Sequence, residues 1–328
     1  MRGLYLEDGE LRLRTDIASP EPGPDEVLIG VDRAGICGTD LEMVRGYKGG
    51  FCGVLGHEFV GRVEWASDPA QVGRRVTASI NVGCNQCAVC RRDGPEHCAR
   101  RTVIGILGRD GVFADQVVIP AFNLHRIPDN VPDEHAVFAE PLAAALRIRE
   151  QVAVRPDQRA AVVGPGRLGM LAARVLSLGG TRVTVIGRRS ESLALAGTWR
   201  LHSDLTGEAG NSSFDLVVEA TGDPAGFAEA IRLVRPRGTL VLKSTYAAAT
   251  RPDAGRPSRP FDLTEIVVAE IRVVGSRCGP FAPALRLLED RVIDLDALID
   301  GEYPLSEGLA AFNHAARPGI RKILLRPS

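Results

Sequence analysis

Hydrophobic and polar residues alternate with a period of two through most of the first 130 residues. Such runs flank a proline-rich turn, SPEPGPDE, and recur at 59–66, 74–80, 113–120 and 124–128. Glycine, proline and aspartate separate them, which is typical of short antiparallel strands joined by turns. The pattern predicts an all-β domain of barrel type that ends near Pro128 and Pro132.

Beyond this point the pattern changes to strands that alternate with helices. A helix is predicted at 135–152, with Pro141 near its start. Strand, helix and strand then follow twice, at 159–166, 167–179 and 181–187 and at 214–222, 224–234 and 238–245. A flexible loop rich in Pro, Gly and Arg is expected at 247–260, followed by a strand at 271–276, a helix at 278–290 and a last strand at 319–327. This alternation predicts a doubly wound α/β domain.

Composition narrows the class of protein. A chain of 328 residues is long enough for two domains. A net charge of −1 and a pI of 6.6 argue against a nucleic-acid or anionic-membrane partner. No apolar run is long enough for a membrane span, and acidic residues stand where a signal peptide would be apolar. We therefore expect a cytoplasmic protein.

The stretch 34–61 combines metal-ligand side chains with many glycines. Cys37, His57 and Glu58 offer a thiolate, an imidazole and a carboxylate, which suit a zinc ion with one exchangeable position. Thr39 places a hydroxyl near whatever the metal binds. Taken alone, these residues are also compatible with a buried cysteine and a surface His-Glu pair.

Four further cysteines form a tight cluster. Cys84, Cys87, Cys90 and Cys98 follow the spacing Cys-x2-Cys-x2-Cys-x7-Cys. Four thiolates make a closed tetrahedral site, which is structural because no coordination position stays open. We expect zinc here, with an iron–sulfur cluster as the alternative.

A glycine-rich turn follows the strand at 159–163 and opens a helix. Gly164, Gly166 and Gly169 match G-x-G-x-x-G in the context that indicates a dinucleotide site. The next strand ends at Gly187, where NAD-binding proteins usually carry an acid. Arg188 and Arg189 follow instead, and their guanidinium groups suit a 2′-phosphate, so NADP is expected rather than NAD.

In this order, C-G-T-D, G-H-E, the four-cysteine lobe, A-E-P-L and G-x-G-x-x-G resemble the zinc-containing alcohol and polyol dehydrogenases of the medium-chain dehydrogenase/reductase superfamily. The resemblance covers essentially the whole chain. It implies a GroES-like β-barrel domain of residues 1–142, completed by 278–328, and a Rossmann domain of residues 143–277. It also implies two zinc ions per chain, an alcohol or ketone as substrate, and a homodimer or homotetramer.

The resemblance also assigns residues. It implies Cys37, His57 and either Glu58 or Glu140 as ligands of a catalytic zinc. Asp40 would hold His57 in one tautomer. Thr39 would pass on the substrate proton, and Glu58 would either bind the zinc or exchange with a water molecule. Many family members have a histidine where Glu42 stands, so its part in the proton relay is open. The expected cofactor contacts are Gly164, Gly166, Arg167, Leu168, Gly169, Gly187, Arg188, Arg189, Thr221 and Lys322.

The resemblance implies hydride transfer between a secondary alcohol and NADP or NAD. The alcohol is expected to be a polyol, sugar or cyclitol, because Glu140 matches a position that is Glu in the sorbitol- and glucose-dehydrogenase-like members. Two alternatives remain. A non-catalytic nucleotide-binding sensor or scaffold would keep the fold without needing the metal ligands. A quinone or enoyl reductase of the same superfamily would need neither metal site.

Overall fold

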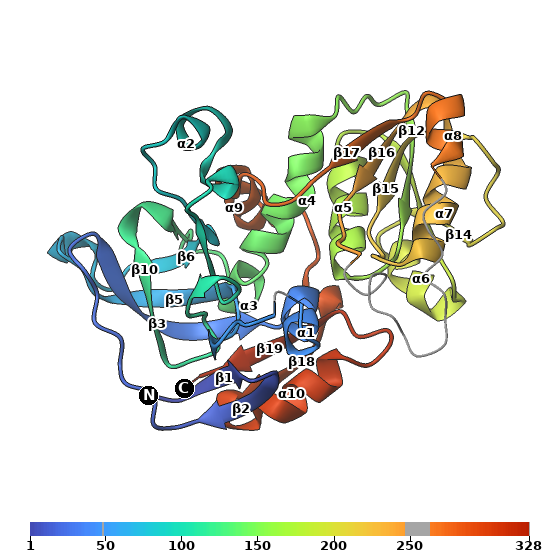
Figure 1. Ribbon diagram of the computed structural model, residues 1–328. Helices are drawn as coiled ribbons and strands as arrows, with labels where there is room; N and C mark the ends of the chain where they lie inside the picture. Colours follow the sequence, from blue (N-terminus) through green and yellow to red (C-terminus); the bar gives the residue numbers. More distant parts are fainter. Residues whose placement is uncertain (48, 247–262, 328) are drawn as a thin grey trace. The chain divides into compact units, whose positions relative to one another are not determined.

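The computed structural model describes residues 1–47, 49–246 and 263–327. The predicted loop at 247–260 lies outside these described residues. The chain forms two compact units (Figure 1). Unit 1 consists of Met1–Glu140 and Phe281–Ser328, and unit 2 consists of Pro141–Pro280.

Unit 1 is built on a seven-stranded sheet. Its strands are β3 (Glu26–Gly35), β5 (Glu58–Trp65), β6 (Arg75–Ala78), β10 (Gln116–Pro120), β11 (Leu124–Arg126), β18 (Ile299–Pro304) and β19 (Lys322–Arg326). Six follow the order β11-β6-β5-β3-β19-β18, and β10 pairs with β3. No pairing among the described residues joins β11 to β18, so the expected barrel is not closed by hydrogen bonds.

Two small sheets complete the strands of unit 1. They contain β1 (Gly3–Glu7), β2 (Glu10–Arg14) and β4 (Gly53–Val54), and β7 (Asn81–Val82), β8 (Thr102–Ile104) and β9 (Gly108–Arg109). The turn between β1 and β2 has positive φ at Asp8 and Gly9, as a two-residue hairpin of right-handed twist requires. Leu4 and Leu6 are buried, as the alternation predicts.

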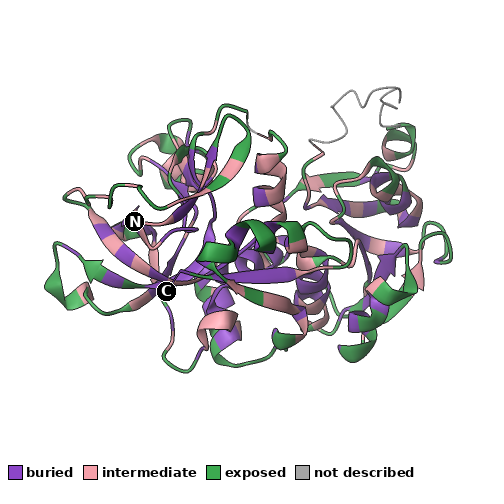
Figure 2. Cartoon of the chain, turned by 90° about the horizontal axis from the view of Figure 1, so that it is seen from below, coloured by how far each residue is buried: buried purple, intermediate pink, exposed green. Residues whose placement is uncertain are grey.

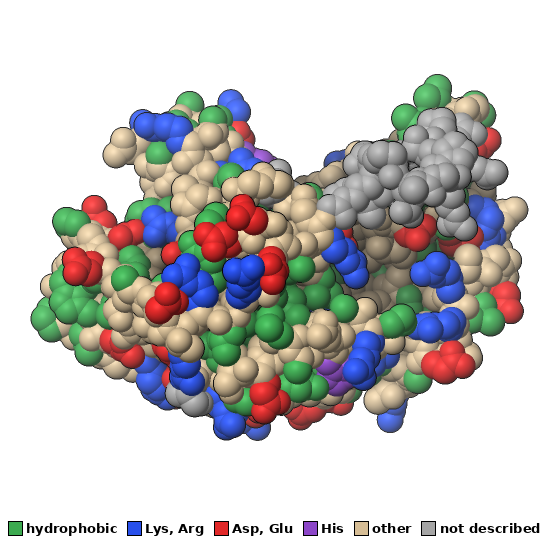
Figure 3. Space-filling view, turned by 60° about the horizontal axis from the view of Figure 1, so that its bottom comes forward, with side chains coloured by type: hydrophobic (Ala, Val, Ile, Leu, Met, Phe, Trp, Pro, Cys, Tyr) green, Lys and Arg blue, Asp and Glu red, His purple; other side chains and the backbone are tan. Residues whose placement is uncertain are grey.

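The helices of unit 1 are short. They are α1 (Gly38–Val44), α2 (Ala88–Asp93), α3 (Asp133–Ala136), α9 (Phe281–Glu289) and α10 (Gly308–Ala315), with 3-10 turns η1 (Pro69–Gln71), η2 (Pro95–His97), η3 (Ala121–Asn123), η5 (Asp296–Leu298) and η6 (Leu305–Glu307). The core is aliphatic and aromatic, with Phe59 and Phe113 fully buried. On the face of unit 1 visible in Figure 3, acidic and basic side chains are interspersed.

Unit 2 is a six-stranded parallel sheet with helices. Its strands are β12 (Arg159–Val163), β13 (Arg182–Gly187), β14 (His202–Leu205), β15 (Phe214–Glu219), β16 (Val234–Leu242) and β17 (Arg272–Gly275). The helices are α4 (Ala139–Gln151), which begins in unit 1, and α5 (Arg167–Ser177), α6 (Ser190–Thr198), α7 (Pro224–Leu233) and α8 (Thr264–Val268).

The sheet order is β14-β13-β12-β15-β16-β17, with every pair parallel. In chain order this is 3-2-1-4-5-6, the arrangement of dinucleotide-binding domains. The central strands β12 and β15 are buried along almost their whole length. In Figure 2, buried residues lie mainly on strands and helices, whereas most loops are exposed. Such sheets bind ligands at the carboxyl ends of their strands.

Some predicted elements differ from the observed ones. The expected helix at 135–152 is two helices in the structure, α3 and α4, which are separated by a turn at Val137 and Phe138. The polar strand β14 was missed because it lacks an apolar run. In the described part of the chain, no helix combines the length and apolarity needed to span a membrane.

Candidate metal centres and cofactor site

Three ligand-type side chains meet in unit 1. One ligand atom from each of Cys37, His57 and Glu58 lies within 4.8 Å of the other two. Cys37 is the N-cap of α1, whereas His57 directly precedes β5 and Glu58 begins it. The two segments meet because Gly35, in β3, pairs with Glu58. Two separate sequence motifs therefore form one group.

Asp40 lies against two members of this group. Its Oδ2 accepts a hydrogen bond from the backbone N–H of Cys37 at 2.8 Å, and its Oδ1 lies 3.2 Å from Nδ1 of His57. Asp40 and His57 are both buried. Burial lowers the pKa of His57, but the charge and hydrogen bonding of Asp40 and Cys37 outweigh it, so the pKa lies well above its usual value.

Lys322, on β19, donates a hydrogen bond from its ammonium to Oε2 of Glu58. Both side chains are shielded from solvent, with exposures of 0% and 1%. The ammonium also lies 5.5 Å from the centre of the Phe138 ring. The neighbour of Lys322 in this structure is thus the carboxylate of Glu58, whereas the resemblance implied a contact between Lys322 and the cofactor.

The backbone before His57 is tightly enclosed. Gly56 has a φ of +96°, and its carbonyl oxygen would lie 2.3 Å from a Cβ at either Gly105 or Gly111. A Cβ on Gly56 itself would lie 2.5 Å from the ring of Phe113. These close approaches need glycine and fix the position from which the His57 side chain extends.

Three other predicted residues lie outside this three-residue group. Glu140 is mostly buried in the first turn of α4 and is not among the side chains of that group. Thr39 is the second residue of α1 and is half-buried. Glu42 forms a 2.7 Å ion pair with Arg45, on the same helix.

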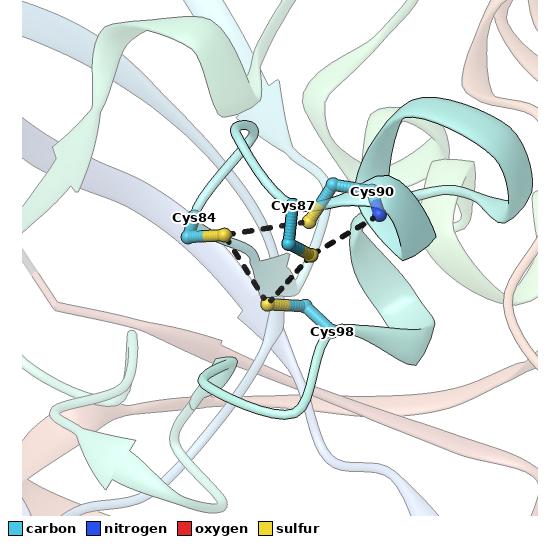
Figure 4. Close-up of side chains that lie close together, drawn as sticks. All are labelled: Cys84, Cys87, Cys90 and Cys98. Carbon is cyan, nitrogen blue, oxygen red and sulfur yellow. Dashed lines mark hydrogen bonds between the residues drawn. The ribbon is translucent and has the colours of Figure 1, made fainter.

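The four cysteines of the second motif converge in a lobe around α2 (Figure 4). The Sγ–Sγ distances are 3.6 Å for Cys84–Cys98, 3.9 Å for Cys84–Cys90 and 4.0 Å for Cys87–Cys98. Zinc–sulfur bonds of about 2.3 Å in a tetrahedron place sulfurs about 3.8 Å apart. The four thiols therefore have the spacing of ligands around one ion.

Backbone donors support a thiolate in the lobe. Hydrogen bonds from the backbone N–H groups of Gln86 and Cys87 lower the pKa of Cys84 to about 5. The guanidinium of Arg100 also interacts with Cys84. Cys87 caps α2 by accepting a hydrogen bond from the backbone N–H of Cys90. The local backbone thus favours the ionised form of Cys84, which is the form that binds metals.

The glycine-rich turn of unit 2 connects β12 to α5. Gly164 has a φ of +105°, and a Cβ at Gly169 would lie 1.9 Å from the Gly164 carbonyl oxygen. Gly166 is the N-cap of α5, and a Cβ there would meet nothing within 4 Å. The turn therefore leaves the N-terminus of the helix approachable by a phosphate. Arg167 and Leu168 begin α5 and are half-buried.

The two arginines that are expected to determine the preference for NADP over NAD follow the carboxyl end of β13. Gly187 ends the strand, and a Cβ on it would lie 3.0 Å from Pro165 of the glycine-rich turn. Arg188 and Arg189 follow and are both exposed, with Arg189 as the N-cap of α6. Their side chains stand at the sheet edge where a dinucleotide would bind.

Thr221 lies in the turn after β15, but its hydroxyl is already engaged. The hydroxyl donates to Glu219 and accepts a hydrogen bond from the backbone N–H of Asp223 at 3.0 Å. Glu219 was not singled out from the sequence, and neither was Tyr246, which donates a hydrogen bond to it. An acid that ends an apolar strand was the only available signal.

Lys243, at the same edge, was also missed. Its ammonium donates to the carbonyl oxygens of Ala144 and Arg277, both at 2.7 Å, and to Oγ of Ser276 at 3.2 Å. Only three of the 40 basic residues are lysines, namely Lys48, Lys243 and Lys322. In an arginine-rich chain, the rarity of lysine was a usable signal for a compact cation with several acceptors.

Known families match both units. The alcohol dehydrogenase GroES-like domain matches residues 23–129, and the glucose dehydrogenase C-terminus matches residues 134–323. A sorbitol dehydrogenase of Halalkalibacterium halodurans is 30% identical over 333 residues, covering 94% of this chain and 93% of the relative.

Two solved structures are similar over 99% of both chains. A protein of Sinorhizobium meliloti 1021, described as a zinc-binding dehydrogenase and bound to NADP, has a TM-score of 0.85 and 27% identity. An alcohol dehydrogenase of Escherichia coli CFT073 in complex with NADH has a TM-score of 0.87 and 26% identity. Together with the family matches, these similarities show that the chain belongs to the zinc-containing alcohol and polyol dehydrogenases of the medium-chain dehydrogenase/reductase superfamily.

Proposed function

We propose that this protein is a zinc-dependent dehydrogenase that oxidises a secondary alcohol of the polyol, sugar or cyclitol type and prefers NADP to NAD. The observation that carries the proposal is the convergence of Cys37, His57 and Glu58 in a dehydrogenase chain. A cysteine, a histidine and a carboxylate form the donor set of a catalytic zinc that keeps one exchangeable position.

Cys37, His57 and a carboxylate would hold the catalytic ion. Nδ1 of His57 faces Asp40, which leaves Nε2 for the metal. Glu58 is the carboxylate within the group, whereas Glu140 is outside it, so Glu58 is our first choice of ligand. When bound, the zinc would supply Lewis-acid polarisation of the alcohol's hydroxyl oxygen, and the nicotinamide would supply the hydride acceptor.

The protein's own residues would handle the proton. Thr39 stands two residues after Cys37 on α1, and its hydroxyl would accept the hydrogen bond of the substrate hydroxyl and pass the proton on. Glu42, one turn further along α1, is partly exposed and ion-paired with Arg45. It would receive the proton only by giving up part of that ion pair.

A second zinc would occupy the four-cysteine lobe. The Sγ–Sγ distances of 3.6–4.0 Å suit a single tetrahedral ion. In an iron–sulfur cluster the cysteines bind different irons and stand further apart, which favours zinc. With four thiolates the ion would have no open position, so its role would be structural.

The cofactor preference rests on Arg188 and Arg189. Both are exposed at the end of β13, where Gly187 is followed directly by these arginines and not by the acid that usually binds the ribose of NAD. A planar guanidinium binds phosphate oxygens bidentately. Gly164, Gly166, Arg167, Leu168 and Gly169 would receive the pyrophosphate at the start of α5.

The substrate class rests on Glu140 and on the similarity to a sorbitol dehydrogenase. For assembly, we propose a homodimer or homotetramer formed through β17, which is an edge strand with exposed Arg272 and Val273. A cytoplasmic location, as expected from the sequence, belongs to the same proposal.

The test is a turnover screen with zinc-loaded protein, NADP and NAD, and a panel of polyols, sugars and simple alcohols. We expect oxidation of a polyol-type substrate, abolished in Cys37→Ser. In Arg188→Ser/Arg189→Ser the preference for NADP should fall by about tenfold or more, the cost of a lost charge-assisted hydrogen bond. Arg182→Ser, at the other end of β13, is the matched control. An unchanged preference would contradict the cofactor assignment.

Metal content separates the alternatives. Two zinc ions per chain are expected for the dehydrogenase. One ion, held by the cysteine lobe, together with cofactor binding but no turnover would favour the sensor. A protein that reduces quinones or enoyl compounds with no bound metal would be the reductase.

A further inference from the structure

Three turns at the carboxyl edge of the unit 2 sheet are in close contact with one another. The turn after β15 lies between the turns after β12 and β16. A Cβ at Gly164, after β12, would lie 2.8 Å from Cγ2 of Thr221. A Cβ at Gly222, which has a φ of +67°, would lie 2.8 Å from the carbonyl oxygen of Thr245, after β16. A shift of the middle turn would therefore move both neighbours.

A fully buried carboxylate holds this middle turn. Glu219 ends β15 and has an exposure of 0%. Its Oε1 accepts hydrogen bonds from the backbone N–H of Thr221 at 2.6 Å, from that of Gly222 at 3.3 Å, and from the Thr221 hydroxyl. Its Oε2 accepts a hydrogen bond from the hydroxyl of Tyr246. One carboxylate thus binds both the turn after β15 and the segment after β16.

This arrangement changes the expected role of Thr221. A hydroxyl has one proton, and that of Thr221 is donated to Glu219. The hydroxyl oxygen accepts the backbone N–H of Asp223, the N-cap of α7. The methyl group of Thr221 packs against Gly164, where it leaves no room for a Cβ. Thr221 therefore connects Glu219 with the glycine-rich turn, so that a movement of Glu219 would displace this turn.

Tyr246 is the second arm of the network. Burial and the hydrogen bond to Glu219 raise the pKa of Tyr246, so its hydroxyl stays protonated and remains a donor. Its ring packs edge-on against Phe227 of α7, with 6.0 Å between ring centroids. The hydroxyl is thereby held in place for Glu219.

We propose that Glu219 is the positioning residue of the dinucleotide site: it fixes the turn after β15 against the glycine-rich turn and holds the segment after β16 beside it. The inference rests on the proposed binding of a nicotinamide dinucleotide at this edge. A carboxylate suits the position because its two oxygens accept four donors from three residues, whereas the glutamine side chain has only one oxygen acceptor.

The experiment is a fluorescence titration of NADPH into the purified protein without alcohol, which needs neither turnover nor a substrate. Glu219→Gln should raise the Kd for NADPH by about tenfold or more, the effect of losing hydrogen bonds to a charged group. Tyr246→Phe and Thr221→Val each remove one hydroxyl and should raise the Kd by a smaller factor. These two variants keep the proposal testable if Glu219→Gln does not fold.

The matched control is Glu229→Gln. Glu229 is also a buried carboxylate of unit 2, but it lies on α7 and binds Arg232 and the backbone N–H of Gly207. We expect this variant to lower the melting temperature while leaving the Kd unchanged. If Glu219→Gln likewise lowers only the melting temperature, Glu219 is merely structural and the proposal fails. If the wild-type protein binds neither NADPH nor NADH, the cofactor proposal is wrong, and the role proposed for Glu219 is wrong as well.

Discussion

The two described lysines show how single residues are matched to their surroundings. Nearly all basic positions of the chain are arginine, yet the buried ones at the two sites are lysine. An ammonium is compact and donates in three directions, which suits the three oxygens around Lys243. A guanidinium is larger and planar, so the exchange would not be conservative there.

Lys322→Met should destabilise the metal-free protein by about 3–5 kcal/mol, because it leaves Glu58 as a buried, uncompensated charge. The double variant Lys322→Met/Glu58→Gln should recover much of this loss, since no charge is then left unpaired. Urea unfolding of the single and double variants measures both values. Equal stabilities of the wild-type protein and Lys322→Met would show that the pair contributes little.

His125 predicts a pH dependence of stability. Burial lowers the pKa of His125, whose Nε2 lies 2.7 Å from Oγ of Ser79 and whose ring stacks on Phe281. The folded protein therefore resists protonation, while the unfolded chain takes up a proton near its ordinary pKa of about 6.5. The stabilisation is complete above that pKa and is lost as the pH falls through the lowered folded value.

We expect the stability of the wild-type protein to fall between about pH 7 and about pH 5 more steeply than that of His125→Gln, which cannot titrate. Urea midpoints across this range give the comparison. His97→Gln, which removes an exposed histidine, should behave like the wild-type protein. Parallel curves for His125→Gln and the wild-type protein would contradict the assignment.

At the scale of elements, the cysteine lobe is expected to depend on the proposed structural metal. It contains only α2, of six residues, and the turn η2, and of its four cysteines only Cys98 is buried. A helix this short is not stable by itself, so a bound ion would take the place of a hydrophobic core in the lobe.

Removal of the lobe metal should therefore loosen 84–98 before the rest of unit 1. We expect Cys90→Ser to lose one zinc ion per chain and to become sensitive to trypsin at Arg91 and Arg92, which are exposed. Cys52→Ser, which removes an exposed cysteine outside both metal groups, is the control. Unchanged proteolysis in Cys90→Ser would show that the lobe folds without its metal.

At the scale of the whole molecule, the parallel sheet of unit 2 ends at β17. This edge strand exposes Val273 at 40%, and α8, which precedes it, exposes Val267 at 76% and Val268 at 72%. An apolar edge strand is a pairing site that a second chain can cover.

Val273→Arg should dissociate the proposed oligomer, because it places charge on that edge. Sedimentation velocity of the variant and the wild-type protein measures the change in mass. Val72→Arg, at a valine of unit 1 that is 49% exposed, is the control and should leave the mass unchanged. A monomeric wild-type protein would contradict the oligomer itself.

The sequence by itself determined most of the elements in their order and the identity of the metal-type side chains. Alternation predicted the strands of unit 1, and G-x-G-x-x-G between an apolar strand and a helix predicted the turn at Gly164. Both signals are local, since a strand period and a glycine turn depend on neighbouring residues. The four-cysteine lobe is also local, because its ligands lie within 15 residues of one another.

Only the tertiary structure decided which distant groups meet. Lys322 reaches Glu58 because β19 pairs with β3, and β3 pairs with β5. Tyr246 and Thr221 meet on Glu219 because β15 and β16 are neighbours in the parallel sheet. No local pattern encodes such partners, since they depend on strand order and on which buried charges must be neutralised. The sequence therefore identified the metal-type side chains and Asp40 beside His57, while the fold brought Lys322 to Glu58 and brought Thr221 and Tyr246 to Glu219.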